Sequence, residues 1–260
     1  MQITTEQIKE LRDQTGISVM QCKKALEEAG GDMEKALMVL KKKSSDISAK
    51  KADREAADGI VVVKKENGKG VILILNCETD FVAKNSDFVA LAEALANKAL
   101  VEGIPAVQAA AKDMIDPVVQ KIGENLRLGE ITELTGAVLG SYVHDGKPGV
   151  LVSLSGGDET LGKDIAMHIA AMKPEYLKKE DIPEEKRKLA TEMFETEVNA
   201  SDKPAEIKVK MLAGKIDTFF KEQTLLEQPF IKNPDTTISG LLKNAGNVTL
   251  NGFIRYSVGK

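Results

Sequence analysis

The sequence predicts an α+β protein, and three patterns support this fold class. About the first forty residues repeat apolar positions every three or four places, as short amphipathic helices do. Two later stretches each have the form strand, turn dipeptide, strand, and a helical pattern follows each of them. A charged region further on returns to helical spacing with narrow apolar seams. The chain therefore combines helical blocks with small hairpin sheets.

Residues 1–45 are predicted to form a module of three short helices with a thin core. The second helix is expected to stop at Gly30-Gly31, because glycine readily adopts the left-handed conformation that ends a helix. The helix starts are marked by capping side chains, namely Thr4 with Gln7, Ser18 with Gln21, both in capping-box spacing, and Asp32.

Residues 46–57 are predicted to be a linker, helical in part. The surrounding stretch is rich in Lys and Ser and has almost no large apolar residue. Its lysines are interrupted by acidic residues, so a solvated connection is favoured over a phosphate-binding patch.

The core is predicted to contain two related halves, 58–139 and 140–182 with 224–260. In the first half, Asn67-Gly68 marks a hairpin turn, and a helix capped near Ser86 follows the second strand. In the second half, Asp145-Gly146 marks the turn, and another helix follows. Equivalent patterns at two places indicate a weak internal duplication. Between them, residues 105–128 are expected to be helical.

Residues 183–223 are predicted to form a helical hairpin inserted into the second half. Apolar seams are interrupted by Ser201-Asp202-Lys203-Pro204, a sequence that favours a turn. Narrow seams of this kind are typical of a hairpin that projects from a body and contacts a partner. The last residues are expected to form a strand.

Composition excludes several classes of protein. The net charge is -4, aromatic residues make up 4%, and there is no Trp, which argues against base stacking or a basic nucleic-acid surface. The run Val71–Leu75 is far shorter than the ~20 apolar residues of a membrane span. Two Cys without a signal-like N-terminus indicate a reducing cytoplasm. We expect a cytoplasmic chain without a metal or cofactor.

Catalytic motifs are weak throughout the sequence. Gly157–Lys163 has part of a phosphate-binding loop, but Asp164 stands where a Ser or Thr is required, so a turn before a helix is favoured. His168 is expected to be packed within a helix, and Cys22 and Cys77 are expected to be buried, inert thiols. No acid/base or nucleophile constellation is present, so we do not expect an enzyme.

One segment, Asn76–Lys84, allows two interpretations. It lies where an apolar strand gives way to a loop, and it places Phe81 beside Asp80 among polar residues. In the structural interpretation, Phe81 packs against the start of the next helix and Asp80 helps to cap that helix. In the functional interpretation, the ring and the carboxylate enter the cation site of a partner protein. Periodicity does not choose between them.

The sequence resembles translation elongation factor Ts. The resemblance is carried in order along nearly the whole chain by LRDQTG at 11–16 with Met20, Cys22 and KKAL at 23–26, NCETDFVAK at 76–84, GSYVH at 140–144, AMHIAAMKPEYL at 166–177, QPFIKNP at 228–234 and GFIRYSVG at 252–259. It implies a ubiquitin-associated-like N-terminal module, a core of two subdomains and a coiled-coil dimerisation hairpin. Many relatives continue into a further C-terminal helix that these 260 residues do not include, so its contact is expected to be missing or supplied differently.

The resemblance also implies a function and a site. The family exchanges guanine nucleotide on elongation factor Tu, binding its GDP-bound and nucleotide-free forms. Thr79, Asp80, Phe81 and Val82 would insert beside the partner's magnesium and phosphate site, and His144 would share this intrusion. A second contact would involve Arg12, Val19 and Met20, where Val19 replaces a Met common in relatives.

Two points remain open from the sequence. The apolar seams of the hairpin 183–223 are compatible with a homodimer. They are equally compatible with packing of the hairpin within one chain. An RNA- or ribosome-associated binding protein without exchange activity is the alternative function, suggested by the helical module and the lysine-rich linker; it predicts steep salt dependence.

Overall fold

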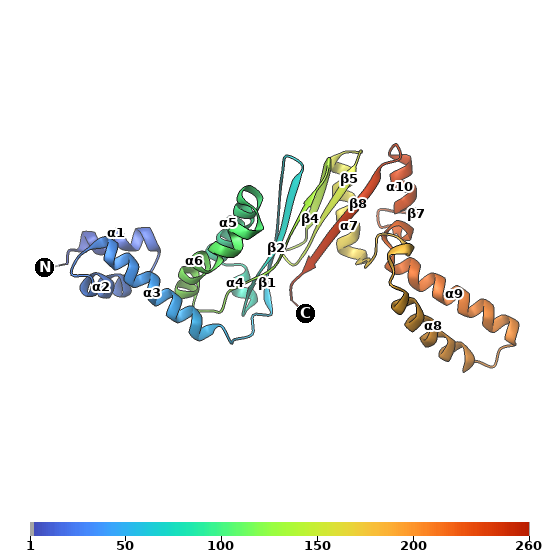
Figure 1. Ribbon diagram of the computed structural model, residues 1–260, viewed down its shortest axis with the longest axis horizontal. Helices are drawn as coiled ribbons and strands as arrows, with labels where there is room; N and C mark the ends of the chain where they lie inside the picture. The colour runs from blue at the N-terminus through green and yellow to red at the C-terminus, as the bar shows by residue number, and fades with distance from the viewer. Residues whose placement is uncertain (1–2, 260) are drawn as a thin grey trace. The chain divides into compact units, whose positions relative to one another are not determined.

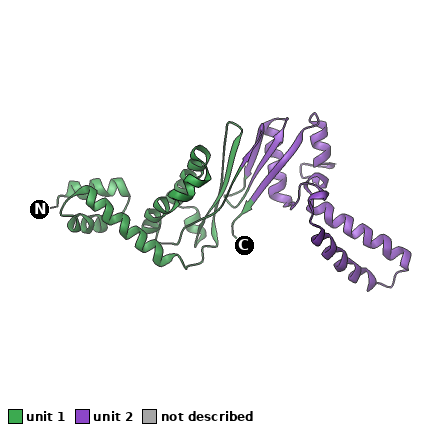
Figure 2. Cartoon of the chain, viewed as in Figure 1, with its two compact units in different colours: residues 1–133, 143–149, 256–260 green, residues 134–142, 150–255 purple. Residues whose placement is uncertain are grey.

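The structure is a computed structural model that describes residues 3–259. Within these residues it is α+β, as predicted, and it divides into two compact units (Figures 1 and 2). The first unit extends to Glu133 and includes Val143–Gly149 and the chain from Tyr256, and the second comprises Leu134–Tyr142 and Val150–Arg255. None of the helices in the described part has an apolar stretch long enough to cross a membrane.

The elements follow one another along the chain, and Figure 1 labels most of them. The α-helices are α1 Thr5–Thr15, α2 Val19–Glu28, α3 Met33–Lys51, α4 Asp80–Ala83, α5 Ser86–Glu102, α6 Ile104–Ile122, α7 Glu159–Met172, α8 Glu184–Asn199, α9 Ala205–Gln223 and α10 Ile238–Asn244. The strands are β1 Asp58–Glu66, β2 Lys69–Cys77, β3 Arg127–Thr135, β4 Val138–Val143, β5 Pro148–Ser155, β6 Pro229–Phe230, β7 Asn233–Thr237 and β8 Thr249–Ser257. Two 3₁₀ turns, Lys179–Asp181 and Leu225–Glu227, flank the hairpin α8–α9.

The three N-terminal helices begin where their caps predict. Thr4 forms a complete capping box with Gln7, and Asp32 accepts a hydrogen bond from the N–H of Lys35. Ser18 also caps α2, but the amide oxygen of Gln21 accepts from the Ser18 hydroxyl, in place of the reciprocal bond of a capping box. The helices enclose a small apolar core made of Leu11, Ile17, Cys22, Ala25, Leu26, Ala36 and Leu40.

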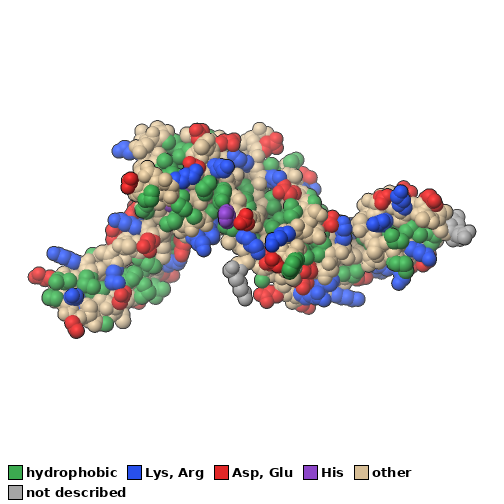
Figure 3. Space-filling view, turned by 180° about the vertical axis from the view of Figure 1, so that it is seen from behind, with side chains coloured by type: hydrophobic (Ala, Val, Ile, Leu, Met, Phe, Trp, Pro, Cys, Tyr) green, Lys and Arg blue, Asp and Glu red, His purple; other side chains and the backbone are tan. Residues whose placement is uncertain are grey.

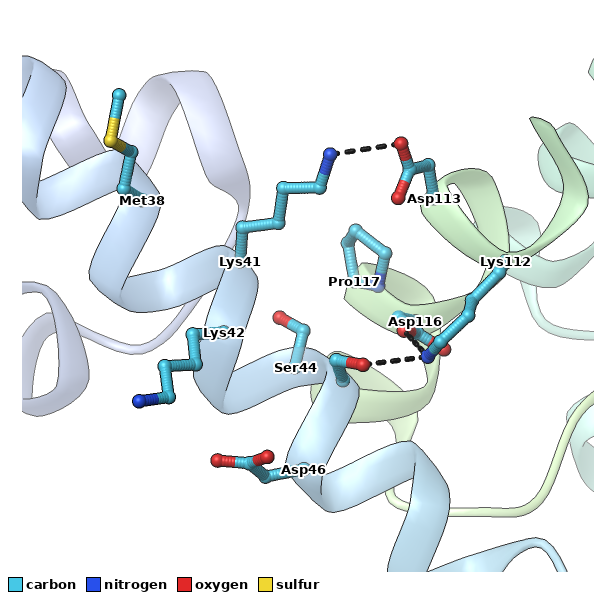
Figure 4. A pocket seen from close by; sticks show the side chains of 10 residues that line it. Met38, Lys41, Lys42, Ser44, Asp46, Lys112, Asp113, Asp116 and Pro117 are labelled. Atoms are coloured by element: carbon cyan, nitrogen blue, oxygen red, sulfur yellow. Dashed lines mark hydrogen bonds and ion pairs between the residues drawn. The ribbon is translucent and has the colours of Figure 1, made fainter.

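α3 continues beyond the module and packs on α6. It ends at Lys51, so the range 46–57 predicted as a linker begins inside a helix. Ile47 packs against the core of the first sheet, which gives this polar stretch an apolar anchor. Figure 4 shows the facing side chains, among them Lys41, whose Nζ lies 2.8 Å from a carboxylate oxygen of Asp113 on α6.

The first sheet has the order β1-β2-β3. β1 and β2 pair antiparallel around Asn67-Gly68, whose positive φ angles of 50° and 76° suit a tight hairpin turn. α5 and α6 supply the residues that cover its core, with Phe88 and Leu95 fully buried.

Part of the expected helix at 105–128 is wrong. α6 ends at Ile122, because Gly123 with φ of 89° closes it, and residues 127–135 form β3. This strand alternates apolar and polar side chains only loosely, so its pairing with β2 depends on the tertiary structure rather than on a clear local pattern.

The second sheet has the order β4-β5-β8, which is the same connectivity as in the first. In each sheet a hairpin is followed by helix, and a later strand pairs with the second strand of the hairpin. Val150, Val152 and Leu154 of β5 pack with Ile165 and Ile169 of α7 in the second core.

α8 and α9 form a helical hairpin with its turn at the predicted place, residues 200–204. Phe194 and Phe219 meet edge to face, with ring centroids 5.4 Å apart. Several apolar side chains remain on its surface, as Figure 3 shows, and these include Leu189, Met193, Ile207 and Val209.

Candidate functional site

The four residues predicted to act together lie at a single turn of helix: Thr79 precedes α4, and Asp80, Phe81 and Val82 belong to it. Thr79 caps it, and the Thr79 Oγ1 accepts a hydrogen bond from the N–H of Val82 at 3.4 Å. Asp80 lies in the first turn, 3.5 Å from the Nζ of Lys84. The Phe81 side chain is 83% exposed. The turn therefore presents an aromatic ring and a carboxylate side by side to solvent.

The exposure of Phe81 overturns the structural interpretation of this segment. A ring that stapled the start of α5 would be covered, and Asn85, not Asp80, caps that helix by accepting from the N–H of Asp87 at 2.9 Å. Burial of a Phe side chain stabilises a fold by about 1.5–3 kcal/mol, and this position forgoes that contribution. Because Ala83 on the same turn is buried in the core, the outward direction of Phe81 is set by the fold.

A carboxylate from a distant segment holds the start of this turn. One oxygen of Glu124 accepts from the N–H groups of Glu78 and Thr79, at 3.0 and 3.1 Å, and the other accepts from the Thr79 hydroxyl at 2.7 Å. In return, Glu78 accepts from the N–H of Asn125 at 2.6 Å. Glu124 is 46 residues from Glu78, and no sequence pattern indicates the contact.

The thiol beside this turn is buried and chemically quiet, as predicted. Burial raises the pKa of Cys77 to about 12, and the negative charges of Asp58 and Glu124 contribute to this rise. The thiol is therefore protonated near neutral pH, and only a thiolate is a strong nucleophile. It donates instead to the carbonyl oxygen of Thr79 at 3.1 Å.

The turn that carries His144 lies against β1. The N–H of Val61 donates to the carbonyl of Gly146 at 2.7 Å, and Lys147 forms an ion pair with Asp58. Burial by itself would raise the pKa of the Asp58 carboxyl. The hydrogen bonds that it accepts from Lys147 and from the N–H of Gly59 have the larger combined effect, so its pKa is lowered.

Asp58 faces Cys77 in the β1–β2 register, so the turn bearing His144 contacts the end of the sheet from which the Phe81 loop departs. His144 is itself exposed, and its Nε2 lies 3.7 Å from a carboxylate oxygen of Asp145.

The three N-terminal candidates are exposed on α1 and α2. Val19 and Met20 open α2 and are 48% and 63% exposed, and Arg12 is exposed in the last turn of α1. They share no element with the loop that carries Phe81. Cys22 on the same α2 is buried, as predicted, with its thiol 3.6 Å from the carbonyl oxygen of Ile17.

Two other sequence candidates are structural, as predicted. His168 is fully buried in α7: Nδ1 accepts from the N–H of Ile231 at 3.2 Å, which leaves Nε2 to donate to the Gln228 amide oxygen at 2.9 Å. Of Gly157–Lys163, Gly157 and Asp158 form the turn, with Asp158 as the cap, and Glu159–Lys163 already belong to α7. Over residues 3–259, no group of three or more His, Cys, Asp or Glu is arranged to hold a metal ion.

The chain is similar to known proteins along its whole length or nearly so. Residues 78–260, which begin at the Phe81 loop, match the family model described as elongation factor TS. Proteins named elongation factor Ts from Saccharophagus degradans and Escherichia coli are each 41% identical, over 269 and 265 residues. In both cases the alignment covers all of this chain and 92% of the relative. The one from Marinobacter nauticus is 42% identical over 265 residues, covering 99% of this chain and 91% of the relative. The chain therefore belongs to the elongation factor Ts family.

Proposed function

We propose that this protein is the guanine-nucleotide exchange factor of elongation factor Tu. It would bind the GDP-bound form in the cytoplasm during translation elongation and promote release of GDP, so that GTP can bind. The observation that carries the proposal is the exposed Phe81 beside Asp80, on a turn anchored from both sides, in a chain of this family.

The proposed mechanism is binding rather than bond chemistry, so the protein is not an enzyme and needs no cofactor. Bound GDP is held by magnesium and by backbone donors of the partner's phosphate loop. A protein that binds best to a state with this site disturbed lowers the affinity for GDP, and GDP lowers the affinity for the protein by the same factor. Exchange is then accelerated without a change in the final equilibrium.

Each predicted residue has a place in this proposal. Phe81 would act as an apolar wedge and Asp80 would disturb the ligands or waters of the magnesium ion, with Thr79 and Val82 framing both. His144 would add to the same intrusion, which agrees with the contact of its turn at the Asp58 end of the sheet.

A second partner contact would come from the N-terminal helices. Val19 and Met20, exposed at the start of α2, would pack with Arg12 against a helix of the partner's nucleotide-binding domain. Exposed apolar side chains of this kind are suited to a protein contact, and no direct nucleic-acid contact is expected.

The proposed organisation follows the family. It comprises a ubiquitin-associated-like module at 1–45, a linker at 46–57, two core subdomains at 58–139 and at 140–182 with 224–260, and a coiled-coil hairpin at 183–223. The exposed Leu189, Met193, Ile207 and Val209 support dimerisation through this hairpin. Sedimentation with and without residues 184–222 tests the dimer, because a dimer made by the hairpin dissociates on this deletion.

The function is tested by stopped-flow release of fluorescent GDP from elongation factor Tu, with wild type beside Phe81→Ala. Wild type should accelerate release strongly, and Phe81→Ala should lose about tenfold or more of the stimulated rate, as expected for a central aromatic contact. Val101→Ala is the matched control, because Val101 is 78% exposed on α5 and has no proposed role. No acceleration by folded wild type would refute the function, and full acceleration by Phe81→Ala would move the site elsewhere.

A further inference from the structure

We propose that Glu124 is the positioning residue of the exchange site. Its carboxylate fixes the start of α4, and thereby the direction in which Asp80 and Phe81 face the partner. This inference rests on the proposed function, and it assigns a role to a side chain outside the loop that contacts the partner.

Three hydrogen bonds converge on this one carboxylate. Glu124 Oε2 accepts from the N–H groups of Glu78 and Thr79, and Oε1 accepts from the Thr79 hydroxyl at 2.7 Å. Hydrogen bonds to a charged acceptor are stronger than those between neutral groups. The three donors belong to the two residues directly before α4, so they set where the helix begins.

α4 needs such support because it cannot hold its own geometry. It has four residues, far fewer than the ~12–15 that an isolated helix requires in water. Phe81 contributes little packing because it is exposed, whereas Val82 and Ala83 anchor the turn from the side of the core. The turn is thus fixed by the core contacts of Val82 and Ala83 and by the hydrogen bonds to Glu124. These contacts direct Phe81 away from the core.

Glu124 is itself held by its neighbours. The side chain of Asn125, which is 7% exposed, donates to the carbonyl oxygens of Arg54 and Ala52 at 2.7 and 3.4 Å. Its N–H donates to Glu78, which also lies 3.5 Å from Arg54. The segment after α6, the stretch before β1 and the start of the Phe81 loop are thus joined in one network, so Glu124 acts from a fixed place.

The position of the loop can be measured without the partner. Because the chain has no Trp, Phe81→Trp introduces a single indole fluorophore at the site. The exposed indole rotates about its own side-chain bonds in either variant, so the informative quantity is the added motion of the loop. The mobile component of the time-resolved anisotropy should be clearly larger when Glu124→Ala is added to Phe81→Trp than in Phe81→Trp alone. Glu102→Ala is the matched control, because Glu102 is an exposed Glu whose ion pair is with Lys98. Unchanged local motion after Glu124→Ala would overturn the positioning role.

The kinetics of GDP release from elongation factor Tu provide a second test of the role of Glu124. Glu124→Ala should slow stimulated GDP release about tenfold, in line with the sensitivity of sites to small displacements of their groups. Glu124→Gln keeps the length and one oxygen acceptor and should recover part of the rate. In the double variant with Phe81→Ala, Glu124→Ala should add no more than the roughly threefold loss expected of Asp80→Ala, because most of its effect passes through the ring that has already been removed.

The outcomes separate positioning from stability and from the function itself. Additive effects of Glu124→Ala and Phe81→Ala, or wild-type release by Glu124→Ala, would overturn the proposal. If wild type fails to accelerate release at all, the proposed function is wrong, while the anisotropy of the introduced indole still decides whether Glu124 positions the loop. Glu124→Gln serves the same anisotropy measurement if Glu124→Ala does not fold.

Discussion

The two sheets make the same strand-to-helix connection in different ways. After β2, residues 78–85 contain the extra turn α4 with its exposed Phe81, before α5 begins. After β5, only residues 156–158 precede α7, with Gly156 and Gly157 at positive φ and Asp158 as cap. The first connection is therefore much longer than the second, and the additional residues carry the candidate site.

This difference shows that the two halves of a repeated scaffold diverge at the candidate site. The strand order is equivalent in both sheets, and a helix follows the hairpin in each, so this scaffold is compatible with a short or a long connection between strand and helix. Loops on a rigid scaffold are where binding residues commonly lie. The connection after β2 is held by Glu124 and by core contacts of Ala83, whereas the one after β5 is held by helix capping.

The largest expected effect concerns how closely the helix of the second sheet approaches its strands. A Cβ at Gly140 of β4 would collide with the backbone of Gly162 in α7. Gly140→Ala should therefore destabilise the protein by about 3 kcal/mol, because backbone must shift. Gly214→Ala is the control, since nothing lies within 4 Å of that Cβ in α9 and Ala favours a helix. Urea unfolding compares them; equal stability would show that this close approach is unimportant.

The next effect is a pH dependence of stability located in the second core. α5 buries only apolar residues, whereas α7 buries His168. Burial lowers the pKa of His168, and its hydrogen bond to Gln228 only partly opposes this. Since the unfolded histidine keeps an ordinary pKa of about 6.5, stability is complete above that pH.

As the pH falls below about 6.5, the unfolded state binds a proton first, so stability should decrease by at most about 1.4 kcal/mol per pH unit until the native histidine is protonated too. Urea unfolding at pH values of about 7.5 and 5.5, on either side of that ordinary pKa, measures this loss. His168→Gln should reduce the pH dependence in this window; an undiminished dependence would assign it to other groups.

A smaller effect is expected when the capping residues of the two connections, Thr79 before α4 and Asp158 before α7, are replaced. Asp158→Ala removes the cap of α7 and should cost about 1 kcal/mol of stability without changing GDP release. Thr79→Val should cost less stability, because α4 is a single turn, yet it should slow release, since the hydroxyl to Glu124 is lost. Thr79→Ser retains that hydroxyl and should release GDP at nearly the wild-type rate. Slower release in Asp158→Ala would remove the distinction between the two connections.

Local chemistry made much of the scaffold predictable. Asn67-Gly68 and Asp145-Gly146 adopt the positive φ angles that such turn dipeptides favour, and Thr4 and Asp32 cap helices as their spacing indicates. These features depend on residues within a few positions of one another, so one sequence is sufficient to find them.

Long-range contacts explain what was missed. β3 is a strand because it pairs with β2. The stretch 46–57 is predicted to be helical in part, but the packing of Ile47 against a core formed later in the chain has no local signal. The outward direction of Phe81 depends on Ala83 entering that core and on Glu124, far away in sequence. The family resemblance pointed to Phe81, but no local pattern could show how it is held.

The smallest expected effect is on GDP release when an acidic residue at a helix start is replaced. Asp80 is the first residue of α4, in the connection after β2, and Glu159 is the first residue of α7, after β5. Asp80 pairs with the exposed Lys84 at 3.5 Å, and such a pair is weak, so its carboxylate is available to a partner's cation. Asp80→Ala should slow stimulated GDP release about threefold when magnesium is plentiful, the size of an exposed charge interaction, and hardly at all when it is chelated. Glu159→Ala should have no magnesium-dependent effect. A defect of equal size with and without magnesium would mean that Asp80 contributes by shape, and the carboxylate would then have no part in disturbing the ion.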